Sequence, residues 1–417
     1  MIKKRIASID ALRGFSLAGI VIVHMVENYI GGPAPAEAMV VANQGILDGI
    51  VNGFLFLFIR GKFFALFSFL FGLSFFIQME NGAHKGARFE GRFLWRLLLL
   101  LIIGAIHHLF YRGDILTIYA LLGILLIPFF KMNTKLIIAT IVLLFLGLGR
   151  YIVFTFFGSD SLFSGIDMDP SNPALQNYYN IIKNGTLDQV FLRNTTEGHL
   201  MKLDFQLGVF GRGYLTFGFF LLGLLAGRLQ LFQKFREQRS KVLNAFFWSL
   251  ALFLLSMVAM ALLFMSLNQG SQGQQAQPDF NNWQAMFALS AYDLSNIFMT
   301  FMLIFAFLLI YLKVNGERFL VKFAPYGRMA LTNYFLQTLI GTALLYGWGL
   351  GYLGELRSIY TFLIGIVIII IQMYFSKWWL SNYKYGPLEW LWRSLTYFKV
   401  YPFKKISQES QFKKSTS

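Results

Sequence analysis

Long apolar runs alternate with short polar segments along almost the whole chain. The runs cover residues 8–30, 46–59, 62–79, 93–111, 114–130, 134–157, 206–231, 242–267, 284–312, 325–347 and 357–379. Most approach the roughly 20 residues that a helix needs to cross a hydrocarbon core of about 30 Å. The pattern predicts an all-α polytopic membrane protein, a bundle of about 10 (10–11) transmembrane helices that forms a single domain over residues 1–400. Residues 401–417 are predicted to be a basic cytoplasmic tail.

The basic residues between the runs predict the orientation. If all eleven runs cross, the basic loop 80–92 falls outside and the later loops invert against the positive-inside rule. If 46–59 is a re-entrant or interfacial helix on the outer side, about 25 of the 36 Lys and Arg residues lie inside. The second arrangement predicts ten crossings of the inner (cytoplasmic) cell membrane, with both termini cytoplasmic. The long loop 158–205 then lies outside, where we expect an ordered lid.

Composition agrees with a chain that spends most of its length in the lipid bilayer. Hydrophobic residues make up 56% of it and charged residues 13%, and 47 residues are Phe. The net charge of +16 fits the positive-inside rule better than a nucleic-acid-binding stripe, so we expect no nucleic-acid partner. The absence of cysteine excludes disulfides and cysteine nucleophiles. The oligomeric state stays open, and a homo-oligomer is compatible with these features.

The first run carries two ionisable residues, Arg13 and His24. They are eleven residues apart, which places them within about 20° of one helix face and about 16 Å apart along the axis. Ionisable side chains inside a membrane span are costly and mark functional sites by default. The alternative is that Arg13 extends to the nearby headgroups and His24 serves packing alone.

A second polar cluster lies at the outer end of two adjoining runs, at a depth similar to that of His24. It contains His107, His108, Arg112 and Asp114. A histidine can take a proton near neutral pH, and we expect Asp114 to orient such a ring. Adjacent His107 and His108 point about 100° apart on a helix, so we expect no metal. The alternative is a structural role, with a histidine bonded to backbone and an Arg112–Asp114 salt bridge.

The run 325–347 carries a polar stripe. Asn333 and Gln337 are four residues apart and share one helix face. Such a stripe either lines a site or makes hydrogen bonds between helices. Arg328 lies near the inner end of this run, where it is a candidate to bind the same phosphate as Arg13.

Several phrases of the sequence resemble one protein family. IDALRGFSLAGIVIVHM resembles the first span of the YeiB-like proteins, defined by domain of unknown function 418. Its Arg-x10-His spacing is also similar to the signature of the membrane acyltransferase-3 superfamily. RGKFFALFSFLFGLSF, GDILTIYALLGILL, APYGRMALTNYFLQT and GPLEWLWRSLTY are similar to further family phrases, and Lys62 is a matched position in the first of these. The resemblance therefore extends over nearly the whole chain.

The acyltransferase resemblance implies a membrane enzyme that takes an acyl group from cytoplasmic acyl-CoA, such as acetyl-CoA. The acceptor would be a hydroxyl or amine of an extracytoplasmic glycan or lipid. Arg13, Arg328 and Lys62 are the residues expected to bind the donor.

In this mechanism His24 would deprotonate the acceptor, and Arg112 or Asn333 would stabilise the oxyanion. A transporter or channel that uses the buried ionisable residues as a path is the alternative, and a scaffold role is a third.

Overall fold

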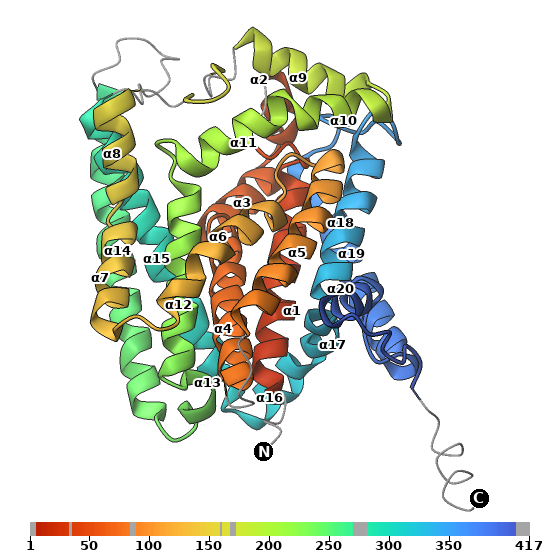
Figure 1. Ribbon diagram of the computed structural model, residues 1–417. Coiled ribbons are helices and arrows are strands. Elements are labelled where there is room, and N and C mark those ends of the chain that lie inside the picture. The colour runs from red at the N-terminus through yellow and green to blue at the C-terminus, as the bar shows by residue number, and fades with distance from the viewer. Residues whose placement is uncertain are drawn as a thin grey trace, which may run out of the picture.

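The computed structural model describes residues 6–32, 36–83, 89–158, 161–166, 172–269 and 282–405, and every regular element in these ranges is a helix. This confirms the all-α fold (Figure 1). The elements are α1 (Ala7–Val26), α2 (Ala36–Ala42), α3 (Ile46–Phe54), the π-helical η1 (Leu55–Ile59), α4 (Phe63–Ala83), α5 (Glu90–Phe110), α6 (Leu116–Phe129), α7 (Thr134–Phe145), α8 (Leu148–Phe157), α9 (Pro173–Asn184), α10 (Leu187–Thr195), α11 (Glu197–Leu207), α12 (Arg212–Arg228), α13 (Leu231–Lys234), α14 (Arg239–Gln269), α15 (Trp283–Tyr311), α16 (Val314–Leu320), the 3-10 helix η2 (Val321–Phe323), α17 (Ala324–Arg328), α18 (Ala330–Leu345), α19 (Ser358–Asn382) and α20 (Pro387–Tyr397).

Six helical stretches in the described ranges are long and apolar enough to cross a membrane, so the chain is a multi-pass membrane protein. The number rises to eight if α7 with α8 and α11 with α12, bent by 53° and 58°, each count as one span. The prediction of about ten was therefore too high. Runs 114–130 and 325–347 yield the 14 residues of α6 and the 16 of α18. At about 1.5 Å per residue, these helices are shorter than a core of about 30 Å.

The helices α9, α10 and α11 cover one end of the bundle, which we call the cap end (Figure 1). Tyr178 of α9 donates to Asn194 of α10 at 2.6 Å, and Asn194 donates to the carbonyl of Leu109 in α5 at 2.7 Å. The predicted lid is thus a helical cap tied to the bundle. The opposite end, where α1 begins, is called the base end. Of the predicted basic tail, residues 406–417 lie outside the described residues.

The segment 46–59 is attached to the cap end at both of its own ends. The carboxylate of Asp48 accepts from Arg357 at 2.9 Å and from the N–H of Ile359 at 3.0 Å, where α19 begins. Arg60, which follows η1, donates to Glu27 just after the end of α1 at 2.6 Å. Because both anchors lie at the cap end, this geometry supports an interfacial helix rather than an eleventh crossing.

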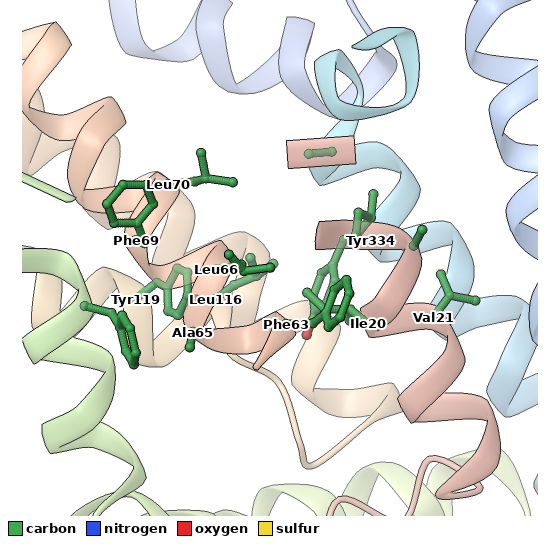
Figure 2. Packing of buried hydrophobic residues seen from close by; sticks show 14 of the residues in the cluster. Ile20, Val21, Phe63, Ala65, Leu66, Phe69, Leu70, Leu116, Tyr119 and Tyr334 are labelled. Atoms are coloured by element: carbon green, nitrogen blue, oxygen red, sulfur yellow. The ribbon is translucent and has the colours of Figure 1, made fainter. Parts of the chain in front are cut away.

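Glycines allow the central helices to approach closely. A Cβ added at Gly72 of α4 would lie 1.9 Å from the carbonyl oxygen of Phe220 in α12, and Gly223 is equally tight against α4. Gly14 and Gly327 bring α1 and α17 together in the same way at the base end. Small residues are the usual means by which membrane helices pack. Figure 2 shows the apolar side chains that fill the core around these crossings.

Candidate functional site

A cavity of about 330 Å³ lies among α1, α4, α5, α6, α17, α18 and α20. This volume is within the usual range for small-molecule sites, about 300–1,000 Å³. Its apolar wall is formed mainly by α4, α5 and α6. The charged and phenolic residues in its lining are Arg13, Arg96, Tyr119, Arg328, Tyr334, Tyr385, Glu389 and Arg393.

Four arginines line the base end of this cavity. Arg13 and Arg328 both line it, and α5 and α20 add Arg96 and Arg393. Arg13 is held in place by Asp10, whose carboxylate accepts its hydrogen bond at 2.9 Å. The Nε atoms of Arg96 and Arg393 are buried and have no hydrogen-bond partner among the described residues. Buried donors without partners are costly, so this end of the cavity is suited to an anion.

Helix α20 closes the base end of the cavity and supplies part of its wall. Its Glu389 accepts hydrogen bonds from the backbone N–H groups of Leu331 and Thr332 at 2.7 and 3.1 Å, which caps the first turn of α18. Trp392 lies under the guanidinium of Arg96, at 4.2 Å from the ring centroid. The carboxylate of Glu389 is thus committed to α18, and it does not pair with the unsatisfied Nε atoms of Arg96 and Arg393.

Tyr334 of α18 lines the cavity and carries a buried hydroxyl without a hydrogen-bond partner in the described structure. Its ring is stacked on that of His107, with centroids 4.7 Å apart, and lies 6.3 Å from the ring of His24. The Nδ1 atom of His24 is also buried and unpaired within the described ranges. Tyr334 therefore stands between the cavity and two histidines. Sequence reasoning did not single it out, because an aromatic residue in an apolar run is typical of packing.

Asp114 and His107 form a completely buried pair. Nδ1 of His107 lies 2.9 Å from Oδ1 of Asp114, and Nε2 lies 2.9 Å from the hydroxyl of Thr338. Asp114 also accepts from the N–H groups of Leu116 and Thr117, at 3.1 and 2.9 Å, where it caps α6. Burial alone would raise the pKa of Asp114, but His107 and these donors hold it below its usual range. The carboxylate is thus charged and placed to orient the His107 ring.

A lysine from the cap completes this network. Lys202 of α11 is buried, and its Nζ donates to the hydroxyl of Thr117 at 2.9 Å and lies 3.2 Å from Nδ1 of His108. The same Thr117 hydroxyl donates to Asp114 at 2.7 Å. The positive charge of Lys202 is therefore balanced by Asp114 through one intervening hydroxyl. Nothing in the local sequence indicates that Lys202 is part of a site. The pattern of apolar runs places it in the predicted outer loop 158–205.

Two of the predicted site residues have structural partners and do not line the cavity. Arg112 donates to the carbonyl of Ile30 at 2.7 Å and lies 4.3 Å from the ring centroid of Tyr178, so it ties the cap to the bundle. The Arg112–Asp114 salt bridge of the alternative interpretation is not formed. Asn333 donates to the hydroxyl of Ser376 at 2.8 Å and joins α18 to α19. These contacts leave neither residue placed to stabilise an oxyanion in the cavity.

Lys62 lies at the cap end, apart from the arginines that line the cavity. Its Nζ donates to the carbonyl of Phe56 at 2.5 Å, and Arg60 beside it pairs with Glu27 at the end of α1. Arg13 precedes Glu27 by fourteen residues, a rise of about 21 Å along the helix. The expectation that Lys62 shares a donor with Arg13 is therefore wrong. The outer placement of 46–59 that the charge pattern favours already starts the run 62–79 at the outer side, so the assignment of Lys62 to the donor did not agree with that arrangement.

The described residues contain no group of three or more His, Asp or Glu side chains arranged to hold a metal ion. The titratable groups on and behind the cavity wall are the Asp114–His107 pair, His24, Tyr334 and Lys202.

Three known proteins are similar to this chain over most of its length. Residues 226–399 match the family described as "Protein of unknown function (DUF418)". The chain is 28% identical over 406 residues to the uncharacterized protein YeiB of Escherichia coli (strain K12), covering 94% of this chain and 96% of YeiB. These matches confirm the resemblance to the YeiB-like DUF418 proteins that the sequence phrases carry. It is also 28% identical to the uncharacterized protein YxaH of Bacillus subtilis (strain 168) and to an uncharacterized 39.9 kDa protein in the amylase 3′ region of Bacillus acidopullulyticus, each over 96% of both chains.

The matched DUF418 segment supplies only part of the site. It contributes Arg328, Tyr334 and the cavity-lining residues of α20. Arg13, His24 and the Asp114–His107 pair precede it in the chain. The site is thus assembled from both halves of the sequence.

Proposed function

We propose that this protein is an integral membrane acyltransferase that transfers an acyl group from cytoplasmic acyl-CoA, such as acetyl-CoA, to an extracytoplasmic glycan or lipid. The observation that carries the proposal is the cavity itself, which has four arginines at its base end and Tyr334, backed by two histidines, on its wall. This arrangement places an anion site at one end of the cavity, and Tyr334 with the two histidines behind it on the wall.

The base end faces the cytoplasm in this proposal, with both termini on that side of the inner membrane. The charge pattern of the loops supports this orientation. The phosphates of the donor bind at the arginines, and the pantetheine arm extends along α4. The lining residues of α4 extend from Phe67 to Gln78, a rise of about 16 Å, comparable to an extended pantetheine arm.

In the reaction, a hydroxyl or amine of the acceptor attacks the thioester carbonyl. His24, whose Nδ1 has no partner among the described residues, takes the acceptor proton. The new C–O or C–N bond forms, the C–S bond breaks, and the CoA thiolate leaves and takes up the proton from His24. The hydroxyl of Tyr334 donates to the developing oxyanion, a role for which it is better placed than Arg112 or Asn333. His107, oriented by Asp114, supports the Tyr334 ring.

A transporter or channel is the second candidate. The observation in its favour is a buried ion pair between Arg150 and Asp293 in two of the apolar helices. Arg150 also donates to Ser290 at 2.8 Å and to the carbonyl of Val209 at 2.6 Å. These groups satisfy one another, so they hold the bend between α7 and α8 without requiring a transported ion.

The test is acyl transfer by the purified protein in liposomes, followed as release of the CoA thiol from acetyl-CoA in the presence of cell-envelope extract. Tyr334→Phe removes a hydroxyl that makes no hydrogen bond to the described residues, so folding is retained. We expect its rate to fall by about 100-fold or more, as for loss of an oxyanion donor. Tyr352→Phe, at an exposed tyrosine, is the matched control. Thiol release no faster than in protein-free liposomes, or an unchanged rate in Tyr334→Phe, contradicts the proposal.

A further inference from the structure

A second cluster of cations lies at the cap end, on the far side of the bundle from the arginine-lined cavity. Lys62, at the start of α4, is close enough to Arg60 and Arg212 to interact with both charges. Arg212 begins α12, and its guanidinium lies 3.5 Å from the ring centroid of Phe64. Lys62 is 3% exposed, whereas Arg212 is half-buried and remains reachable. We call Lys62 and Arg212 the cap-end cation pair.

Nearby carboxylates are already engaged elsewhere. Glu27 pairs with Arg60 at 2.6 Å, and Asp293 pairs with Arg150. Within the described ranges, neither Lys62 nor Arg212 has a carboxylate partner, and the guanidinium of Arg212 makes no hydrogen bond. The region has two carboxylates, those of Glu27 and Asp293, and two positive charges more than that. Its four cations are Arg60, Lys62, Arg150 and Arg212.

Cations in excess of carboxylates in a low-dielectric region are unfavourable, since Lys62 and Arg212 lose hydration without gaining a carboxylate at ion-pair distance among the described residues. A bound anion would supply the missing counter-charge. The face of Phe64 fixes the guanidinium plane of Arg212, and planar guanidinium groups bind phosphate oxygens through paired N–H donors. Lys62 adds a second charge, although one of its N–H groups donates to the carbonyl of Phe56. The pair is thus suited to a phosphate group.

The geometry points to a second binding site, in which Lys62 and Arg212 bind the phosphate group of the acceptor. The assignment of the ligand as acceptor rests on the proposed function. Glu27, which borders this region, follows His24 by three residues, a rise of about 4.5 Å. The cap-end cation pair therefore lies beside the end of α1 that carries His24, and Glu27 there is about 21 Å by helix rise from the donor arginine Arg13. The site selects phosphate-bearing acceptors over neutral ones.

Binding of phosphatidic acid and of inorganic phosphate to the purified protein in non-ionic detergent tests this site, with diacylglycerol as the neutral comparison. We expect phosphatidic acid or phosphate to bind the wild type, and Arg212→Gln to bind at least tenfold more weakly. Arg193→Gln, which removes a cation paired with Glu197 on the cap, should bind as the wild type does. Saturable binding of phosphate alone identifies a soluble phosphate group as sufficient, whereas binding of phosphatidic acid alone identifies a lipid phosphate.

Two further variants keep the test decisive. Arg212→Lys retains the charge, so recovery of binding in this variant shows that a loss in Arg212→Gln is electrostatic rather than a folding defect. Arg13→Gln should leave phosphate binding at the cap end intact while weakening CoA binding. If phosphate binding depends on Arg212 but no acyl transfer occurs, the site stands and the proposed function fails. Binding of neither probe, or equal binding by wild type and Arg212→Gln, overturns the site even if acyl transfer is found.

Discussion

Replacing Asp114 by Asn tests the buried pair at the centre of the site. Each carboxylate oxygen of Asp114 accepts a backbone N–H, Oδ1 from Leu116 and Oδ2 from Thr117. Oδ1 also contacts His107, and Oδ2 accepts the Thr117 hydroxyl. Whichever oxygen becomes the amide nitrogen therefore places a donor against a buried N–H. The substitution keeps the shape of the side chain and still breaks the network.

The expected loss of stability follows from these contacts. A buried donor left without its acceptor costs about 1–3 kcal/mol, and weakening the cap of α6 adds about 1 kcal/mol. We expect Asp114→Asn to lower the free energy of unfolding by about 2–4 kcal/mol. The pKa of Asp114 is depressed in the folded protein, so its stabilisation is present above its unfolded pKa of about 3.9. That stabilisation is lost as the pH falls through the lower folded value.

The assay is thermal unfolding in detergent, combined with CoA thiol release by the fraction that remains folded. Asp188→Asn is the matched control, because Asp188 is an exposed residue in the first turn of α10. Its effect should be within about 0.5 kcal/mol. A loss of less than 1 kcal/mol for Asp114→Asn would refute the reasoning about the buried network. Unchanged transfer by the folded variant would show that the Asp114–His107 pair is not needed for the reaction.

Two other substitutions test the packing around the cavity. Gly72→Ala should lower the free energy of unfolding by about 1–3 kcal/mol, because its Cβ would overlap the carbonyl of Phe220 on α12. A melting temperature equal to that of the wild type would contradict the close crossing of α4 and α12. Gly91→Ala, with open space at its Cβ, is the control and should melt at or slightly above the wild-type temperature. Glu389→Ala removes the cap of α18 and should cost about 1–3 kcal/mol and weaken CoA binding by releasing α20, whereas unchanged stability in thermal unfolding would show that this contact is not needed.

Much of the site was predictable from local pattern. Helix periodicity places Arg13 and His24 on one face, and the short link between α5 and α6 places Asp114 near the histidines. The base-end position of Arg328 followed from counting along its run, which is why its meeting with Arg13 in the cavity was foreseen. These inferences need only the periodicity of a helix and the direction in which each run crosses the membrane.

Contacts between distant helices were not predictable in the same way. Lys202 reaches the pair through the docking of α11, and Tyr334 stacks on His107 because of the rotation of α18. Lys62 is at the cap end because both ends of 46–59 are anchored there, through Asp48 and Arg60. The number of spans was overestimated for a related reason, since apolar runs do not reveal where a helix begins or breaks. Register, rotation and helix ends depend on tertiary packing, which a single sequence encodes only indirectly.

Binding of acetyl-CoA and free CoA to the purified protein, measured by calorimetry, tests the central claim most directly. Arg13→Ala and Arg328→Ala remove two of the cavity arginines, and Arg193→Ala removes a cap arginine as the control. The account predicts saturable binding by the wild type and the control, weakened at least tenfold in both cavity variants. Absence of binding at millimolar CoA, or equal binding by all four proteins, would contradict it.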